Sequence, residues 1–212
     1  MKKTNTVVFL LLLSTMAVNA QENLMDKRDR FQVGVKVGGS YSNVYDTQGD
    51  EFKADAKFGV TGGAFVRIPL GTYIGAQIEG MVTQKGFKAT GKILGSSYEF
   101  KRTTTFLEIP LLVALKPSEF ITIVGGPQYS YLLKQRDEFT SSTLSFAQEQ
   151  EFKNDNVRKN ILGFIVGVDI NLKNLVLGGR MGWDFQNNQG DGTSTTPRYK
   201  NVCTQITIGY RL

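Results

Sequence analysis

The last eleven residues, Val202–Leu212, constrain the fold most, because apolar and polar side chains alternate along them to the final position. Valine, isoleucine, tyrosine and leucine recur on one face, and the other face carries Asn201, Gln205, Thr207 and Arg211. Successive side chains of a β-strand point to opposite faces, so the segment predicts a strand with one apolar and one polar face. Terminal strands of this kind are typical of transmembrane β-barrels, in which the last strand pairs with the first. We interpret the whole chain as organised around that closure.

Seven earlier segments show the same alternation and are long enough to cross a bilayer as tilted strands. They are Phe31–Tyr41, Lys57–Ile68, Thr72–Lys85, a fourth that ends at Leu115, Phe120–Lys134, Val157–Leu172 and Leu175–Gln186. In the fifth of these strands Pro127 lacks a backbone donor, and we expect a bulge or kink there.

The connections between these strands alternate in length. Three are short and rich in turn residues: Pro69-Leu70-Gly71, Lys116-Pro117-Ser118 and Leu172-Lys173-Asn174. The others are longer and polar; Gly86–Ser97 is expected to be a loop or a flared hairpin tip, and Arg136–Asn156 a long external contact surface. The pattern predicts an all-β fold, an eight-stranded antiparallel up-and-down transmembrane β-barrel with short periplasmic turns and long extracellular loops.

A soluble barrel resembling a lipocalin, or a β-sandwich, is the alternative, because it would bury the apolar face instead. The glycines argue against it, since many lie on the polar face: Gly34, Gly38, Gly59, Gly63, Gly75, Gly163, Gly167, Gly178, Gly182 and Gly209. Small residues suit the crowded interior of a narrow barrel. Aromatic residues near strand ends on the apolar face also predict interfacial girdles: Tyr41, Tyr129, Tyr131, Trp183, Phe185 and Tyr210.

The N-terminal segment reads as a secretory signal peptide. Met1-Lys2-Lys3 is positively charged, Val7–Leu13 is a short apolar run, and Val18-Asn19-Ala20 is a small-residue cleavage site. We therefore expect residues 1–20 to be a cleaved signal peptide, 21–30 a short periplasmic tail and 31–212 the barrel domain. The predicted location is the outer membrane of a Gram-negative bacterium.

Composition excludes several classes of chemistry. The chain has no histidine and a single cysteine, Cys203, so imidazole-based catalysis, imidazole metal sites and an intramolecular disulfide are all excluded. Asp46, Asp50 and Asp55 do not have the spacing of a calcium loop. The net charge of +6 includes the charges of Lys2 and Lys3, and the sequence has no run of lysines and arginines that would indicate a nucleic-acid-binding surface. We expect no enzyme activity, no cofactor, no metal and no nucleic-acid partner.

Charged side chains on the polar face form the candidate site. Four are cations and four are carboxylates: Lys36, Arg67, Arg180 and Arg211, with Glu79, Glu108, Asp169 and Asp184. Because an eight-stranded barrel is only wide enough for its own side chains and an isolated buried charge is costly, we expect a salt-bridge network that plugs the lumen. The alternative is a polar conduit or binding pocket lined by Glu79, Glu108 and Arg180.

One motif carries a family resemblance. Phe106–Leu112 (FLEIPLL), together with the glycine-rich first strand (FQVGVKVGGSYSN), resembles the PorT-like outer-membrane β-barrel family. The resemblance implies an outer-membrane barrel and a possible part in type IX secretion, with envelope or secretion-complex proteins as partners beside membrane lipid and the barrel-insertion machinery. Two functions remain open: a structural or interaction barrel, and a small diffusion pore or ligand-binding barrel. Arg67 or Arg180 is the hypothetical partner of Glu108.

Overall fold

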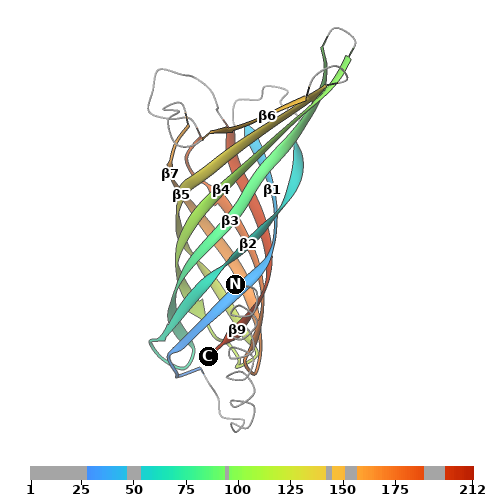
Figure 1. The fold of residues 1–212 in the computed structure, drawn as a ribbon. Helices are drawn as coiled ribbons and strands as arrows, with labels where there is room; N and C mark the ends of the chain where they lie inside the picture. Colours follow the sequence, from blue (N-terminus) through green and yellow to red (C-terminus); the bar gives the residue numbers. More distant parts are fainter. Residues whose placement is uncertain (1–27, 47–53, 94–95, 142–144, 151–156, 189–198) are drawn as a thin grey trace, which may run out of the picture.

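The chain folds as one antiparallel sheet that closes into a barrel (Figure 1). The computed structural model describes residues 28–46, 54–93, 96–141, 145–150, 157–188 and 199–212. The strands are β1 (Gln32–Asp46), β2 (Asp55–Pro69), β3 (Ile74–Ile93), β4 (Ser96–Leu115), β5 (Ile121–Ser141), β6 (Ser145–Gln150), β7 (Asn160–Leu172), β8 (Leu175–Asp184) and β9 (Tyr199–Arg211). The predicted signal peptide lies outside the described residues. Within them, no helix is long and apolar enough to cross a membrane.

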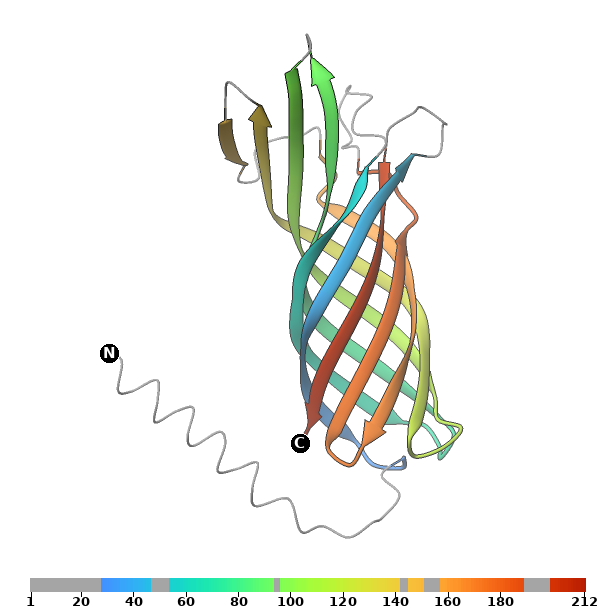
Figure 2. The same ribbon diagram turned by 90° about the vertical axis from the view of Figure 1, so that its right-hand side faces the viewer.

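Pairing of the last strand with the first closes the barrel, as predicted. β1 and β9 run antiparallel from Gly34↔Arg211 to Asp46↔Tyr199, and the ring continues in the order β4-β3-β2-β1-β9-β8-β7-β5, with β4 also paired to β5. β6 pairs only with β5 and lies outside the ring. The ring thus contains eight strands. Figure 2 shows them tilted relative to the barrel axis, with the C-terminus at the short-turn end. Closure leaves no unpaired edge along the wall.

Burial settles which face points inward. Polar residues such as Gln77 and Asp169 are fully buried, whereas Val37, Phe58 and Ile206 are 62%, 77% and 73% exposed. The polar face therefore lines the lumen and the apolar face covers the outside, which we call the apolar belt. This is the opposite of a soluble lipocalin-like barrel, and it is the arrangement that hydrocarbon requires.

The three short connections lie where turn residues predicted them. Two residues, Lys173 and Asn174, join β7 to β8, and Lys173 adopts the left-handed conformation with φ 53°. At the same end the chain entering β1 packs against these turns: Lys116 donates to the carbonyl of Arg28, and Thr72 donates to Asp29. The described part of the predicted tail is thus bound to the floor of the barrel.

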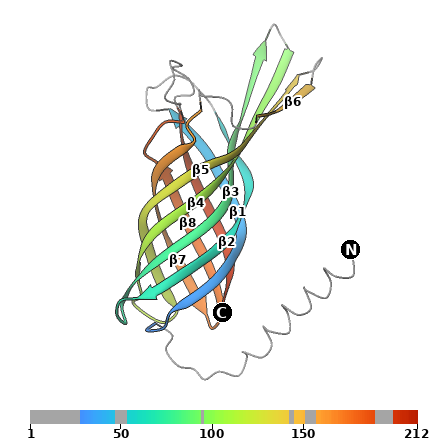
Figure 3. The same cartoon turned by 60° about the vertical axis from the view of Figure 1, so that its left-hand side comes forward.

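At the opposite end the structure shows the hairpin, one of the two forms expected for Gly86–Ser97, and it differs from the expectation for Arg136–Asn156. Gly86–Ser97 is mostly strand, because β3 and β4 continue as a hairpin to Ile93↔Ser96. Part of Arg136–Asn156 is also strand, since β5 extends to Ser141 and pairs with β6. We call the upper parts of β3, β4 and β5, with β6, the sheet extension. It projects beyond the rim and away from the barrel axis (Figures 1 and 3).

The expected bulge at Pro127 is wrong. β5 pairs with β7 through Pro127↔Phe164 without a change of register, and its register with β4 is the same on both sides of Pro127, at Pro110↔Gln128 and Val113↔Gly125. The irregularity in β5 instead lies beside Leu133, where the pairing with β4 shifts between Thr105 and Phe106. Beyond it the inward positions move by one residue, which brings Gln135 into the lumen.

Candidate functional site

The lumen holds two separate ionic clusters. The cluster nearer the short turns, which we call the lower cluster, joins β1, β2, β3, β7 and β8. In it Lys36 Nζ lies 2.6 Å from Glu79 Oε1, and Arg180 bridges the two carboxylates, 3.4 Å from Glu79 and 2.7 Å from Asp169. Arg67 completes the lower cluster, because its guanidinium nitrogen lies 2.9 Å from the second carboxylate oxygen of Asp169.

Neutral side chains extend the lower cluster around the barrel. Arg67 Nε donates to Gln77 at 2.6 Å, and the amide of Gln77 donates to Glu79 at 2.5 Å. The side-chain oxygen of Gln32 accepts hydrogen bonds from Arg67 and Arg211. Buried charges are tolerated when other groups satisfy their remaining hydrogen-bonding capacity. The hydrogen bonds given above meet most of that capacity in the lower cluster, whereas the Nε of Arg180 is buried without a hydrogen-bond partner in the described residues.

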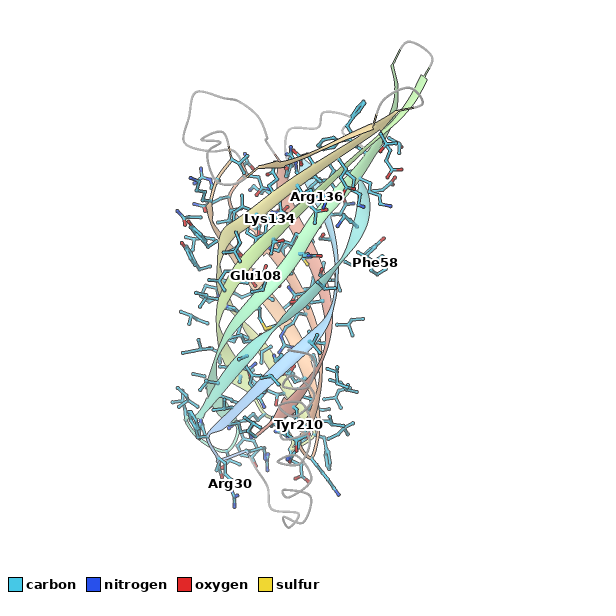
Figure 4. The ribbon with its side chains drawn as sticks, viewed as in Figure 1. Arg30, Phe58, Glu108, Lys134, Arg136 and Tyr210 are labelled. Atoms are coloured by element: carbon cyan, nitrogen blue, oxygen red, sulfur yellow. The ribbon has the colours of Figure 1, made fainter. Side chains whose placement is uncertain are left out.

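The second cluster, the upper cluster, centres on Lys85. Its ammonium lies 2.7 Å from Glu108 and 3.6 Å from Asp184, and all three side chains are at most 3% exposed. Glu108 also accepts from Gln128 and Gln205, at 2.9 and 3.0 Å. In Figure 4 Glu108 lies between the level of Lys134 and Arg136 above and that of Tyr210 below.

The structure places all eight of the predicted lumen residues inside the barrel, but it changes one pairing. The sequence hypothesis named Arg67 or Arg180 as the partner of Glu108, but Glu108 forms an ion pair with neither. Both guanidinium groups belong to the lower cluster. Arg211 is buried near the floor, where it donates to Gln32 and to the carbonyl of Lys173. The residue of the two clusters that the sequence reasoning missed is Lys85. Extending the alternation of Thr72–Lys85 by a single step beyond Thr83 would have found it.

Apolar side chains fill the space beside these charges. Leu112, Ala114, Val124 and Ile165 pack together inside the barrel, and Phe106, Leu132 and Ile161 form a second group. Rings also cover two of the ammonium groups: Lys36 lies 4.8 Å from the Phe65 centroid and Lys85 5.2 Å from that of Phe106. The described interior is therefore packed with side chains, as expected for a barrel of this strand number.

A third polar group closes the rim at the long-loop end. All three nitrogens of the Arg102 guanidinium donate hydrogen bonds. Two go to the Asp137 carboxylate, each at 2.7 Å, and one goes to the Tyr199 hydroxyl at 2.8 Å. Burial raises the pKa of the Tyr199 phenol, so this hydroxyl stays protonated. Burial lowers the pKa of Arg102, but the bonds to Asp137 outweigh it and raise that pKa above its ordinary value. A small pocket lies beside this group, between Phe87, Tyr199 and Asn201.

The predicted interfacial aromatics lie on the outer face. Tyr41, Tyr129 and Phe185 are exposed, and Tyr131, Trp183 and Tyr210 are half-buried. Two have polar anchors, because the Tyr129 hydroxyl donates to Asn160 and Asn174 donates to Tyr210. The sequence reasoning left out further exposed aromatics near strand ends, namely Phe31, Tyr45, Phe58, Tyr73 and Phe120.

Nothing in the described part of the chain assembles a metal site; no group of three or more histidine, cysteine, aspartate or glutamate side chains could hold an ion there. Each carboxylate of the two clusters instead faces a lysine or an arginine. This arrangement can neutralise charge inside a narrow barrel.

A closed barrel with an ion-paired interior and an apolar exterior defines an integral barrel of the outer-membrane type. A family model described as "Outer membrane protein beta-barrel domain" matches residues 19–190, and the chain belongs to this family. A comparison with curated proteins returned no match.

Solved structures share the architecture at low identity. Ail, the attachment invasion locus protein of Yersinia pestis, is 14% identical with a TM-score of 0.44, over 85% of this chain and 98% of that one. Neisserial surface protein A is 11% identical with a TM-score of 0.43, over 85% and 97%. OprG from Pseudomonas aeruginosa is 12% identical with a TM-score of 0.39, over 87% and 97%.

Proposed function

We propose that this outer-membrane barrel has a structural or interaction role in the cell envelope and that its lumen does not conduct. The ion-paired lumen carries the proposal. Its two clusters link strands on opposite sides of the barrel, since Arg180 of β8 reaches Glu79 of β3 and Lys85 of β3 reaches Asp184 of β8. Opening a path for ions would require breaking buried charge pairs, which is energetically costly.

Single-channel recording in planar bilayers tests this directly. The purified barrel, with its folded state verified by its heat-dependent gel mobility, should give no discrete conductance steps. A double variant, Lys85→Ala with Glu108→Ala, removes the centre of the upper cluster and serves as the comparison. Discrete channels from the wild-type protein would establish the alternative function, a small diffusion pore.

The sheet extension is the surface that we assign to protein contacts. It stands clear of the apolar belt, and β6 adds a strand outside the barrel that contributes nothing to closure. A barrel needs no such extension to remain in the membrane, so its role lies outside the bilayer. The resemblance to PorT-like proteins makes components of type IX secretion the partners to test first.

A shortened hairpin separates this role from barrel assembly. Replacing residues 90–99 by Asn-Gly joins the cross-strand pair Ala89↔Phe100 through a two-residue turn. We expect the variant to fold normally but to lose partners that co-purify with the wild-type barrel from detergent-extracted outer membranes. Recovery of the same secretion components with both proteins would contradict the assignment.

A further inference from the structure

We propose that the floor of the lumen binds a small inorganic anion, such as chloride, beside Arg211. Charge inside the barrel is unevenly distributed. The eight lumen charges predicted from the sequence balance, four against four, but the structure does not spread them evenly along the barrel. The upper cluster holds one cation and two carboxylates. The lower cluster together with Arg211 holds four cations and two carboxylates, namely Lys36, Arg67, Arg180 and Arg211 with Glu79 and Asp169.

The surplus of positive charge lies at Arg211. The other three cations each form an ion pair with Glu79 or Asp169. The Arg211 guanidinium instead donates to two neutral groups, the side-chain oxygen of Gln32 at 3.1 Å and the carbonyl of Lys173. Among the described residues no carboxylate forms an ion pair with it. Arg211 is only 7% exposed, and a buried cation without a counter-charge is costly.

The geometry around Gln32 shows where the negative charge is missing. Its Oε1 atom accepts a hydrogen bond from Arg67 at 3.3 Å and another from Arg211 at 3.1 Å. Two guanidinium groups thus converge on one amide oxygen. A neutral oxygen satisfies their donors but leaves their mutual repulsion in place, because only an opposite charge favours both charged forms.

A second observation at the same side chain points to a ligand. The Nε of Arg211 is buried and has no hydrogen-bond partner in the described residues. Buried donors of this kind are rare in folded proteins and commonly indicate a bound water or ion. A water would satisfy the donor alone, whereas an anion satisfies the donor and the charge together. Arg211 lies at the short-turn end, where it contacts the turn between β7 and β8, so an ion can reach it from that end.

The upper cluster cannot supply this charge. Gln205, which donates to Glu108, precedes Arg211 along β9 by about 20 Å at a rise of about 3.3 Å per residue. An ion pair forms only when the charged atoms approach to about 4 Å. The carboxylate surplus of the upper cluster therefore lies too far from the floor, and the compensating anion comes from the surrounding solution.

The experiment measures urea unfolding of the full-length barrel in lipid vesicles while chloride replaces gluconate at constant ionic strength. Gluconate is a much larger anion and does not fit a buried site. For the wild type, each tenfold rise in chloride above its dissociation constant should lower the unfolding constant about tenfold, because the ion binds only the folded state. The constant ionic strength keeps general screening unchanged.

A charge change at Gln32 locates the effect. Gln32→Glu places a carboxylate between Arg67 and Arg211, so it should raise the urea midpoint in gluconate and remove the response to chloride. Asn160→Asp is the matched control. It adds the same charge at an exposed position near the opposite end of the barrel and keeps the acceptor for the Tyr129 hydroxyl, so its response to chloride should equal that of the wild type.

The other outcomes overturn the proposal. Equal unfolding of the wild type in chloride and gluconate would show that the floor holds no anion and that a water occupies the Nε of Arg211. An unchanged chloride response in Gln32→Glu would place the anion elsewhere on the barrel. If Gln32→Glu does not fold, Arg211→Gln replaces it, because removing the surplus cation must also abolish the response. A response that persists in Arg211→Gln contradicts the site.

Discussion

Lys85 and Glu108 lie inside the barrel on neighbouring strands, with the lysine nitrogen 2.7 Å from the carboxylate. They are not register partners: Glu108 pairs with Met81, and Lys85 with Thr104. The two side chains meet inside the lumen, where Asp184 of β8 supplies a second carboxylate to Lys85. The contact thus depends on the stagger of the strands in the closed barrel and on side chains that reach across its lumen.

Removing the Glu108 charge should destabilise the barrel. In Glu108→Gln the buried Lys85 keeps only Asp184 at 3.6 Å, so we expect a loss of about 3 kcal/mol in the free energy of unfolding. Denaturant titration in lipid vesicles measures it. Glu138→Gln removes a carboxylate from the surface pairs on the sheet extension and should leave stability unchanged, because exposed ion pairs contribute little. Equal stability of Glu108→Gln and the wild type would contradict the buried pair.

Loss of the Asp169 charge should cost more than loss of the Glu108 charge. Asp169 is fully buried and pairs with two guanidinium groups, Arg67 at 2.9 Å and Arg180 at 2.7 Å. In Asp169→Asn the carboxylate is lost and both cations keep fewer partners, so we expect about 4–5 kcal/mol, measured in the same titration. A smaller loss than that of Glu108→Gln would show that Glu79 alone can balance the lower cluster.

Alternation predicted the wall of the barrel because lipid imposes it: the outward residues of a membrane strand are predominantly apolar. Above the belt the outward residues are polar, while the inward residues mix polar side chains with Phe87 and Phe100, so this signal becomes weak. For the upper part of β3, with Gly86, Gly91 and several small polar residues, the sequence therefore left a loop and a flared hairpin tip both open, and the structure shows the hairpin. Lys85 was missed for the same reason, since it lies next to Gly86 at the point where the apolar pattern ends.

The pairing inside the lumen could not be predicted from the sequence either. Faces follow from alternation, but partners depend on the stagger of the closed sheet, and a single irregularity changes it. The extra residue, Leu133, which nothing in the sequence marked, shifts the inward positions of β5 from Leu132 to Gln135. The visible signal, Pro127, produced no shift. Assigning Glu108 to an arginine was wrong because its position along the barrel axis was unknown.

Close approach of neighbouring strands should make Gly63 intolerant of a side chain. A Cβ atom there would overlap the carbonyl oxygen of Gly80 on β3, whereas a Cβ atom on Gly80 itself would meet nothing within 4 Å. We expect Gly63→Ala to lose about 1–3 kcal/mol of unfolding free energy or to fold poorly. Gly80→Ala is the control and should stay within about 0.5 kcal/mol of the wild type. Urea titration of both variants in vesicles decides, and equal stabilities would refute the steric argument.

Truncating the last strand should prevent assembly. Val35 pairs with Tyr210 and Gly34 with Arg211, and Leu212 donates its backbone N–H to Val33 at 2.8 Å. Deleting Tyr210–Leu212 would leave the beginning of β1 without its partner at the short-turn end, exposing backbone groups in the membrane. We expect the truncated protein to be nearly absent from purified outer membranes, as measured by immunoblotting. Leu212→Phe keeps every backbone bond and supplies a terminal aromatic, so its level should equal or exceed that of the wild type. Normal membrane levels of the truncated protein would show that the barrel can close without this end of β9.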